Sequence, residues 1–349
     1  MESNDVSIRS ACSWLTIRLD YDVTSVLISF LAFISIGVVL AIGSATAGKL
    51  WFGKPWPAAR GLAREIVTTT GISVAITVVI SLFLGWTGFL DSQFYRPSSR
   101  NYDEHSKLGL SPDDVFFESR DGTRLNGWFI PSDGPPIGTV IHFHGSDRNI
   151  SWTIRNSHWL TEYGFNLFLF DYRGYGKSEG NPSPVGVVDD AVAAIEYVRS
   201  RSEVDSEKLF LWGQSMGGQL AIVAADRVGT EGIKSIVADA TYASHSHHVK
   251  DKVAQMGPLW LIQWAVWLTT SDTHAAHKVV TRIAPTHLLV VHGLADRGVR
   301  PYHGEWLFNV AKEPKDIWRV EGAGHLEVLR DPAHREQLVE SFQRSLQAD

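Results

Sequence analysis

The chain has 349 residues, of which 44% are hydrophobic and 20% are charged, and its formal net charge is −6. This composition is typical of a folded protein, and the chain is too long for one small domain. The negative charge argues against a nucleic-acid partner. The single cysteine, Cys12, excludes an internal disulfide and so gives no indication of an oxidising or a reducing compartment.

Two long apolar runs follow an N-terminal tail of residues 1–22. Residues 23–48 and residues 66–90 contain no Asp, Glu, Lys or Arg, and each run is long enough to cross a hydrocarbon core of about 30 Å as a helix. We therefore expect two transmembrane helices within residues 23–90, with the lipid bilayer as a partner. Buried helices of a soluble core are an alternative, and so is a signal peptide cleaved at the triplet 45–47.

The connector between the runs, residues 49–65, carries four cations, Lys49, Lys54, Arg60 and Arg64. Because cations are enriched in short cytoplasmic loops, the connector is expected in the cytoplasm. Both termini and the large C-terminal part would then lie on the opposite side. The sequence thus predicts an integral membrane protein with an extracytoplasmic C-terminal domain.

Residues 91–113 have the polar composition of a linker, and strand and helix patterns then alternate through residues 114–349. We expect strands at residues 115–118, 124–131, 138–143, 166–170, 209–212, 234–238, 287–291 and 316–320. We expect helices at residues 152–163, 185–199, 302–311 and 331–346, the last with Asp331 as its N-cap. Such alternation predicts an α/β fold with a mostly parallel eight-stranded sheet and helices on both faces.

The residues Gly213-Gln214-Ser215-Met216-Gly217 stand between an apolar strand and an apolar helix. A strand that reverses into a helix within one or two residues leaves no space for side chains beside the turn, so glycine is required on both sides of Ser215. In this G-x-S-x-G pattern the serine hydroxyl is exposed above the sheet, and the next backbone N–H can stabilise an oxyanion. We interpret Ser215 as a nucleophile, with an ordinary glycine-rich turn as the alternative.

A serine hydroxyl is a poor nucleophile at neutral pH and needs a base, normally histidine, that a carboxylate orients. Asp296 follows the expected strand at 287–291, and His325 follows the strand at 316–320. Because the carboxyl ends of parallel strands meet at one edge of a sheet, we predict that Ser215, Asp296 and His325 converge there. Asp239, at the end of the strand after Ser215, is the competing acid.

The oxyanion of an acyl-transfer intermediate needs two backbone donors. Met216, directly after the nucleophile, is expected to supply one N–H group. The loop after His144-Gly145 is expected to supply the other, as the N–H of Ser146.

An insertion is expected at residues 240–285, because this stretch between two strands is longer than a simple crossover needs. Its centre, residues 258–268, carries three tryptophans at helical spacing, Trp260, Trp264 and Trp267. One interpretation is a helix packed on the sheet. The other is a lid whose tryptophans bind substrate in an acyl pocket or touch the membrane surface.

Taken together, these motifs resemble the α/β-hydrolase fold, and specifically its membrane-anchored branch, which is similar to serine aminopeptidase-like hydrolases, monoacylglycerol lipases and protein depalmitoylases. The resemblance covers about residues 110–345 and excludes the two N-terminal runs. The matching motifs are His144-Gly145, residues 171–178 (DYRGYGKS), residues 213–217, His292-Gly293 with Asp296, and Gly324-His325. Residues 146–148 depart from the Asn- and Gly-rich loop of many relatives, which leaves the second oxyanion donor open.

The sequence thus predicts a membrane-tethered serine hydrolase that cleaves carboxylic esters or thioesters through an acyl-enzyme, with a lipid-derived acyl chain as the preferred substrate. A serine peptidase acting on short peptides is the main alternative, and a non-catalytic membrane scaffold on the same fold is another. No cofactor is expected. No metal is expected either, because no recognised four-ligand spacing is completed by the histidine cluster of His245, His247 and His248.

Overall fold

The computed structural model describes residues 59–86 and 94–347, together with residues 33–35, 38–39, 42–43, 46 and 49–50. The chain divides into two compact units. One consists of residues up to 90 with residues 246–270, and the other consists of residues 91–245 with residues 271–349. We call them the N-terminal unit and the sheet unit.

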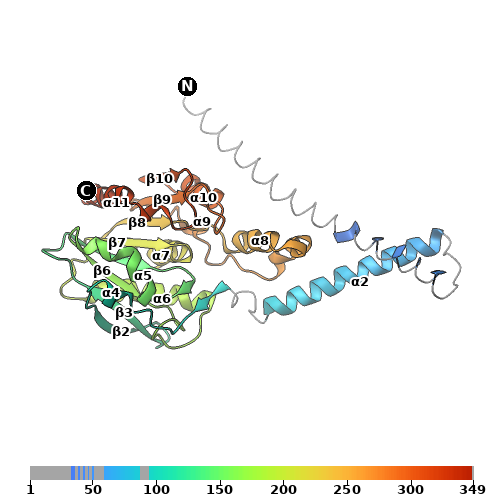
Figure 1. Ribbon diagram of the computed structural model, residues 1–349, viewed down its shortest axis with the longest axis horizontal. Helices are drawn as coiled ribbons and strands as arrows, with labels where there is room; N and C mark the ends of the chain where they lie inside the picture. The colour runs from blue at the N-terminus through green and yellow to red at the C-terminus, as the bar shows by residue number, and fades with distance from the viewer. Residues whose placement is uncertain are drawn as a thin grey trace, which may run out of the picture. The chain divides into compact units, whose positions relative to one another are not determined.

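The sheet unit is built on an eight-stranded sheet with the strand order β10-β9-β8-β7-β4-β6-β3-β2 (Figure 1). Its strands are β2 (Asp113–Glu118), β3 (Arg124–Ile130), β4 (Gly138–Phe143), β6 (Phe165–Phe170), β7 (Leu209–Gln214), β8 (Ile233–Asp239), β9 (His287–Gly293) and β10 (Lys315–Val320). Only β3 runs antiparallel to its neighbours, β2 and β6; the other neighbouring strands are parallel. The predicted mostly parallel eight-stranded sheet is confirmed.

Alternate side chains of the central strand β7 enter two separate apolar cores. Leu209 and Leu211 belong to one core, and Phe210 and Trp212 belong to the other. The first core includes residues of α6 (Pro184–Ser200) and α7 (Met216–Val228), and the second includes residues of α5 (Ile150–Ser157) and α11 (Pro332–Ser345). Because both faces are covered, the strand is an uninterrupted apolar run rather than an alternating one.

Helices α6 and α11 begin where the sequence supplies a capping side chain. Ser183 accepts a hydrogen bond from Gly186 N at the start of α6, and Asp331 accepts one from Ala333 N at the start of α11. The predicted cap at Asp331 is therefore confirmed. The remaining short elements of the sheet unit are α4 (Glu104–Lys107), η1 (His158–Thr161), α9 (Ala276–Val279), α10 (Tyr302–Val310) and η3 (Val328–Arg330).

The stretch expected as a linker, residues 91–113, is partly integrated into the sheet unit. Its strand β1 (Arg96–Pro97) pairs in parallel with β5 (Asp147–Arg148), which lies in the loop after β4. This pairing uses backbone groups rather than apolar side chains, so the polar composition of the stretch gave no indication of it.

The N-terminal unit contains the helix α2 (Ala59–Trp86). By length and composition, residues 61–80 of this helix could cross a membrane, and they form the one such span among the described residues. The helix begins and ends earlier than the expected run of 66–90, so Arg64 lies within it and not in the connector. The first expected span, residues 23–48, lies mostly outside the described residues.

The insertion consists of α8 (His245–Gln255) and η2 (Gly257–Leu268), and η2 is a 3₁₀ helix rather than the α-helix that the tryptophan spacing indicated. Within the N-terminal unit, η2 packs against α2. The ring of Trp264 lies edge-on to Phe33, with 6.1 Å between the ring centroids. Trp267 lies edge-on to His247, with 4.8 Å between the centroids.

Candidate active site

Ser215 occupies the turn between β7 and α7, and its backbone is in an unusual conformation with φ 54° and ψ −117°. A positive φ is uncommon for a residue with a side chain and is retained only where the surroundings impose it. Here Ser215 N donates to Asp239 O at 2.8 Å, and the hydroxyl of Thr241 donates to Ser215 O. The neighbouring strand β8 and the residues after it thus hold the turn in place.

The glycines beside Ser215 are required by close packing. A Cβ atom on Gly217 would lie 2.0 Å from Phe143 O, and one on Gly213 would lie 2.3 Å from Gly217 O. Since both obstacles are backbone atoms, neither position can accept a side chain without moving a strand or the helix. The turn therefore fixes the position of the Ser215 side chain at the carboxyl end of β7.

Asp296 and His325 form a hydrogen-bonded pair. Asp296 follows β9, His325 follows β10, and His325 Nδ1 lies 2.8 Å from Asp296 Oδ2. The other oxygen of Asp296 accepts hydrogen bonds from Gly298 N at 2.6 Å and from Val299 N at 2.9 Å. Asp296 is buried, whereas the His325 side chain is 32% exposed. The backbone thus fixes the carboxylate, and the carboxylate orients the imidazole.

Burial alone would raise the pKa of the Asp296 carboxyl. The imidazoles of His292 and His325 and the amide of Val299 outweigh this effect and hold the pKa well below its usual range. Asp296 is therefore ionised at neutral pH. A carboxylate can only accept a hydrogen bond, so Nδ1 of His325 carries the proton and Nε2 is left as the basic nitrogen.

His292 is a contact of Asp296 to which the sequence analysis assigned no role. Its Nε2 lies 3.5 Å from Asp296 Oδ2 and 3.0 Å from Val299 O. It therefore links the carboxylate to the turn that holds it. Its place directly before Gly293 at the end of β9 is the one signal that could have indicated this function.

Asp239, the competing acid, lies at the end of β8 and is fully buried. One of its oxygens accepts a hydrogen bond from Gln214 Nε2 at 3.1 Å. Burial raises the pKa of Asp239 to about 6, although Gln214 and the positive charge of His325 and His292 act in the opposite direction. Because Nδ1 of His325 bonds to Asp296, the geometry favours Asp296 as the orienting carboxylate.

Ser146 lies in a loop that passes the nucleophile turn, since a Cβ atom on the preceding Gly145 would lie 3.6 Å from Ser215 Cβ. His144 Nδ1 lies 2.6 Å from Gly145 O and must donate to it, because a carbonyl oxygen only accepts. In a trans peptide the C=O and the following N–H point in opposite directions. The Ser146 N–H is therefore directed away from the His144 ring.

Two further groups fix the position of Ser146 through its carbonyl oxygen. Its carbonyl oxygen accepts hydrogen bonds from the Arg96 amide at 2.8 Å and from the Tyr175 hydroxyl at 2.9 Å. Tyr175 belongs to the polar loop after β6, and Arg173 of the same loop forms a bidentate ion pair with the buried Asp190 of α6. This ion pair fixes the loop that carries Tyr175.

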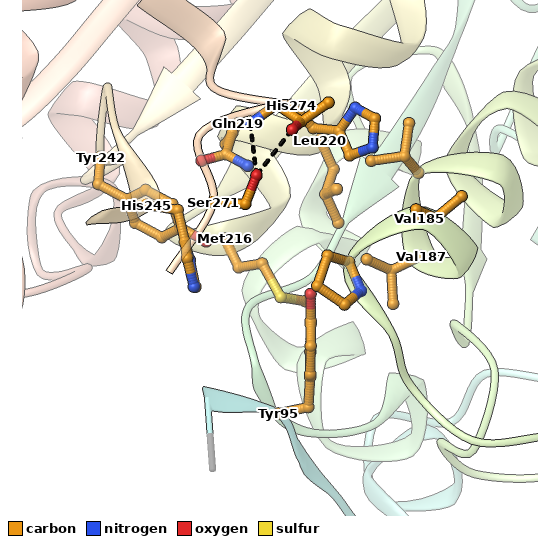
Figure 2. A pocket seen from close by; sticks show the side chains of 13 residues that line it. Tyr95, Val185, Val187, Met216, Gln219, Leu220, Tyr242, His245, Ser271 and His274 are labelled. Atoms are coloured by element: carbon orange, nitrogen blue, oxygen red, sulfur yellow. Dashed lines mark hydrogen bonds between the residues drawn. The ribbon is translucent and has the colours of Figure 1, made fainter. Parts of the chain in front are cut away.

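A cavity of about 170 Å³ lies beside the nucleophile turn (Figure 2). The side chain of Met216, whose backbone amide is the expected oxyanion donor, forms part of its wall. The tryptophans expected to bind substrate, Trp260, Trp264 and Trp267, are not among the residues that line it. Their part in substrate binding stays a prediction.

Ser215, Asp296 and His325 follow strands β7, β9 and β10, so all three stand at the carboxyl end of the parallel sheet. Among the described contacts there is no hydrogen bond between Ser215 Oγ and His325. Among the residues that the structure describes, no three His, Cys, Asp or Glu side chains are grouped in a way that could hold a metal ion.

The strand order, the turn at Ser215 and the Asp296–His325 pair are those of an α/β hydrolase, and the chain belongs to the α/β-hydrolase family. The family model described as serine aminopeptidase, S33, matches residues 134–284. The uncharacterized protein YfhR of Escherichia coli K12 is 36% identical over 256 residues, which are 71% of this chain and 85% of that protein.

Two other comparisons extend the likeness. YfhR of Salmonella typhimurium is 34% identical over 303 residues, which are 82% of this chain and 98% of that protein. Among solved structures, the esterase Pf2001 of Pyrococcus furiosus has a TM-score of 0.59 at 21% identity, covering 73% of this chain and 98% of the esterase. At this identity the esterase supports the fold alone.

Proposed function

We propose that the protein is a membrane-tethered serine hydrolase that cleaves carboxylic esters or thioesters through an acyl-enzyme. The observation that carries the proposal is the hydrogen bond of 2.8 Å from His325 Nδ1 to Asp296, on the same sheet edge as the strained turn of Ser215. A serine at such a turn, with a base that is oriented by a carboxylate, is the arrangement that activates a hydroxyl for acyl transfer.

In the first half-reaction, Ser215 Oγ attacks the carbonyl carbon while its proton passes to Nε2 of His325. The imidazolium that forms is stabilised by the ionised Asp296. The negative charge on the carbonyl oxygen is held by the N–H groups of Met216 and Ser146. Collapse of this intermediate breaks the bond to the leaving alcohol or thiol, which takes the proton from His325.

In the second half-reaction, water attacks the acyl group on Ser215, and His325 accepts a proton from the water. The new intermediate collapses to a carboxylic acid and releases Ser215, which recovers its proton from His325. The cycle uses no cofactor. The exposure of His325 is consistent with the entry of water.

The membrane tether is the second component of the proposal. The described span of α2, residues 61–80, is long and apolar enough to insert in a bilayer. Large apolar side chains on this helix, among them Val67, Val79 and Phe83, are more than half exposed. A lipid environment would remove this apolar surface from water. With the positively charged connector in the cytoplasm, the sheet unit would be extracytoplasmic.

A peptidase is the second candidate, and the description of the matching family model favours it. An aminopeptidase must hold the free ammonium group of its substrate, and a buried ammonium needs a carboxylate partner. No Asp or Glu is among the residues that line the cavity beside Met216. This supports an ester or thioester as the substrate. Faster hydrolysis of aminoacyl p-nitroanilides than of matched esters would instead favour the peptidase.

The proposal is tested by labelling the full-length protein with a fluorophosphonate probe, which reacts with activated serines. We expect the native protein to be labelled and both Ser215→Ala and His325→Ala to lose the label. Ser146→Ala should retain it, because the expected donor is a backbone N–H that the substitution leaves in place. If the native protein is folded and stays unlabelled, the serine hydrolase proposal is wrong, and a non-catalytic scaffold is favoured.

A further inference from the structure

The cavity beside the nucleophile turn lies between two helices of the sheet unit. Met216 and Leu220 on the first turns of α7 form one wall, and Val187 and Val188 on the first turn of α6 form the opposite wall. Figure 2 shows the side chains of Met216, Leu220 and Val187 directed into a common space. Met216 directly follows Ser215 in the chain, so the cavity lies next to the nucleophile turn.

The cavity is also lined by residues at which the insertion and the N-terminal segment join the sheet unit. The insertion leaves the unit at His245 and returns at Ser271, and both residues line the cavity. Tyr95, which directly precedes β1 after the N-terminal segment, lines it as well. A ligand in the cavity would therefore contact the residues at both ends of the insertion.

The chemistry of the lining selects a neutral apolar group. No Asp, Glu, Lys or Arg lines the cavity, and its inner walls are valine, leucine and methionine side chains. The lining also includes Gln219, Ser271, Thr273 and the two histidines His245 and His274, and Ser271 and Thr273 are exposed. A cationic group would lose its hydration here without gaining an opposite charge. Burial lowers the pKa of His274, which favours its neutral form.

The size of the cavity limits the length of the group. An apolar protein cavity of roughly 150 Å³ holds one benzene molecule, which has six carbon atoms. The cavity here, at about 170 Å³, is slightly larger. The part of a long fatty acyl chain beyond about six carbon atoms would extend outside it.

We infer that this cavity is the acyl-binding subsite and that it accepts a neutral acyl group of about six carbon atoms. The inference rests on the proposed function and narrows its substrate from acyl esters in general to short-chain ones. The acyl group is the part of the substrate that remains on Ser215 through both half-reactions. The alcohol must leave before water attacks, so a recess between α6 and α7 suits the acyl group.

The test measures kcat/KM of the full-length protein in detergent for p-nitrophenyl esters from acetate to dodecanoate, each below its own micellar concentration. We expect kcat/KM to rise about fourfold for each added methylene until the cavity is full. The maximum should fall at butanoate to hexanoate. Dodecanoate should be hydrolysed no faster than hexanoate, because methylene groups that lie beyond the cavity stay in solvent and add no binding energy.

Two substitutions of Leu220 should move the maximum in opposite directions. Leu220→Ala enlarges the cavity and should shift the maximum to octanoate or longer. Leu220→Phe fills it and should shift the maximum to acetate or propanoate. Val223→Ala, one turn further along α7 and outside the lining, is the matched control, because it also truncates a buried side chain. It should leave the preferred length unchanged.

A second series keeps the acetyl group and varies the alcohol. In this series the Leu220 variants should leave the preferred length of the alcohol unchanged. A shift in that length would instead show that the cavity binds the alcohol. An active native protein that prefers dodecanoate, or a profile that neither Leu220 variant moves, would overturn the inference and leave the serine hydrolase intact. If the native protein is not labelled by the fluorophosphonate probe, the proposed function itself is contradicted.

Discussion

Two buried carboxyl groups, Asp239 and Asp296, stand at the ends of neighbouring strands, and their pKa values are shifted in opposite directions. Asp296 receives hydrogen bonds from two backbone amides and from His325, which favour its ionised form. Asp239 receives one from Gln214, which does not compensate for its burial. Environments that separate two acids in this way indicate which one works as an anion.

We therefore expect Asp296→Asn to lower kcat for ester hydrolysis by about 10⁴-fold, because an amide no longer selects the tautomer with a basic Nε2. Asp239→Asn should lower kcat by less than about tenfold, since the amide oxygen can still accept the hydrogen bond of Gln214. Both variants are isosteric, so differences in packing should be small. Equal losses in the two variants would show that Asp239 shares the orienting function.

The raised pKa of Asp239 has a consequence for stability. Its pKa is about 6 in the folded protein and 3.8 in the reference state. Between these values the folded state holds a proton that the unfolded state has released, so the free energy of unfolding decreases as the pH rises. The loss is complete above pH 6 and amounts to about 3 kcal/mol.

Asp239→Asn should therefore stabilise the protein at pH 8 and not at pH 4. The measurement compares thermal unfolding of the native protein and the variant in detergent at a series of pH values. The difference in Tm should grow between pH 4 and pH 6.5 and then remain constant. A difference that is independent of pH would mean that Asp239 titrates normally.

At the scale of elements, the apolar patterns were sufficient to predict the sheet. β4 occupies residues 138–143 as expected, and all six of its residues are buried. The pattern could not predict β1, whose two residues pair through backbone groups with a loop far along the chain. Nor could it distinguish Asp239 from Asp296, since both follow expected strands, and the hydrogen bonds that separate them, above all the one from His325 Nδ1, appear only in the structure.

The contact of β1 with the oxyanion loop links the N-terminal segment to the proposed site. The Tyr175 hydroxyl and the Arg96 amide bind the same carbonyl oxygen of Ser146. Tyr175→Phe removes one of these bonds and leaves the ring in place. We expect kcat to fall about tenfold, less than for direct loss of an oxyanion donor, with KM nearly unchanged.

Tyr163→Phe, which removes a hydroxyl from an exposed tyrosine, is the control and should leave kcat unchanged. Partial unfolding would also lower the apparent kcat at constant KM, so kcat is calculated per folded molecule, with the folded fraction measured by thermal unfolding. If the fall in apparent kcat equalled the loss of folded protein, the hydroxyl would serve stability alone.

At the scale of the whole molecule, the number of membrane spans decides which side the sheet unit occupies relative to the N-terminal tail. With α2 and a second span at residues 23–48, the tail and the sheet unit lie on the same side. With α2 alone they lie on opposite sides. The single cysteine, Cys12, lies in the tail and offers a direct chemical probe of its side.

We expect a membrane-impermeant maleimide to modify Cys12 in intact cells, because both termini are predicted outside the cytoplasm. The Cys12→Ser, Ser202→Cys variant places the only thiol on the exposed surface of the sheet unit, and it should react equally. Reaction of one thiol and not the other would require an odd number of spans. Reaction of both only after lysis would retain two spans and place the sheet unit in the cytoplasm, where its substrates would be cytoplasmic esters.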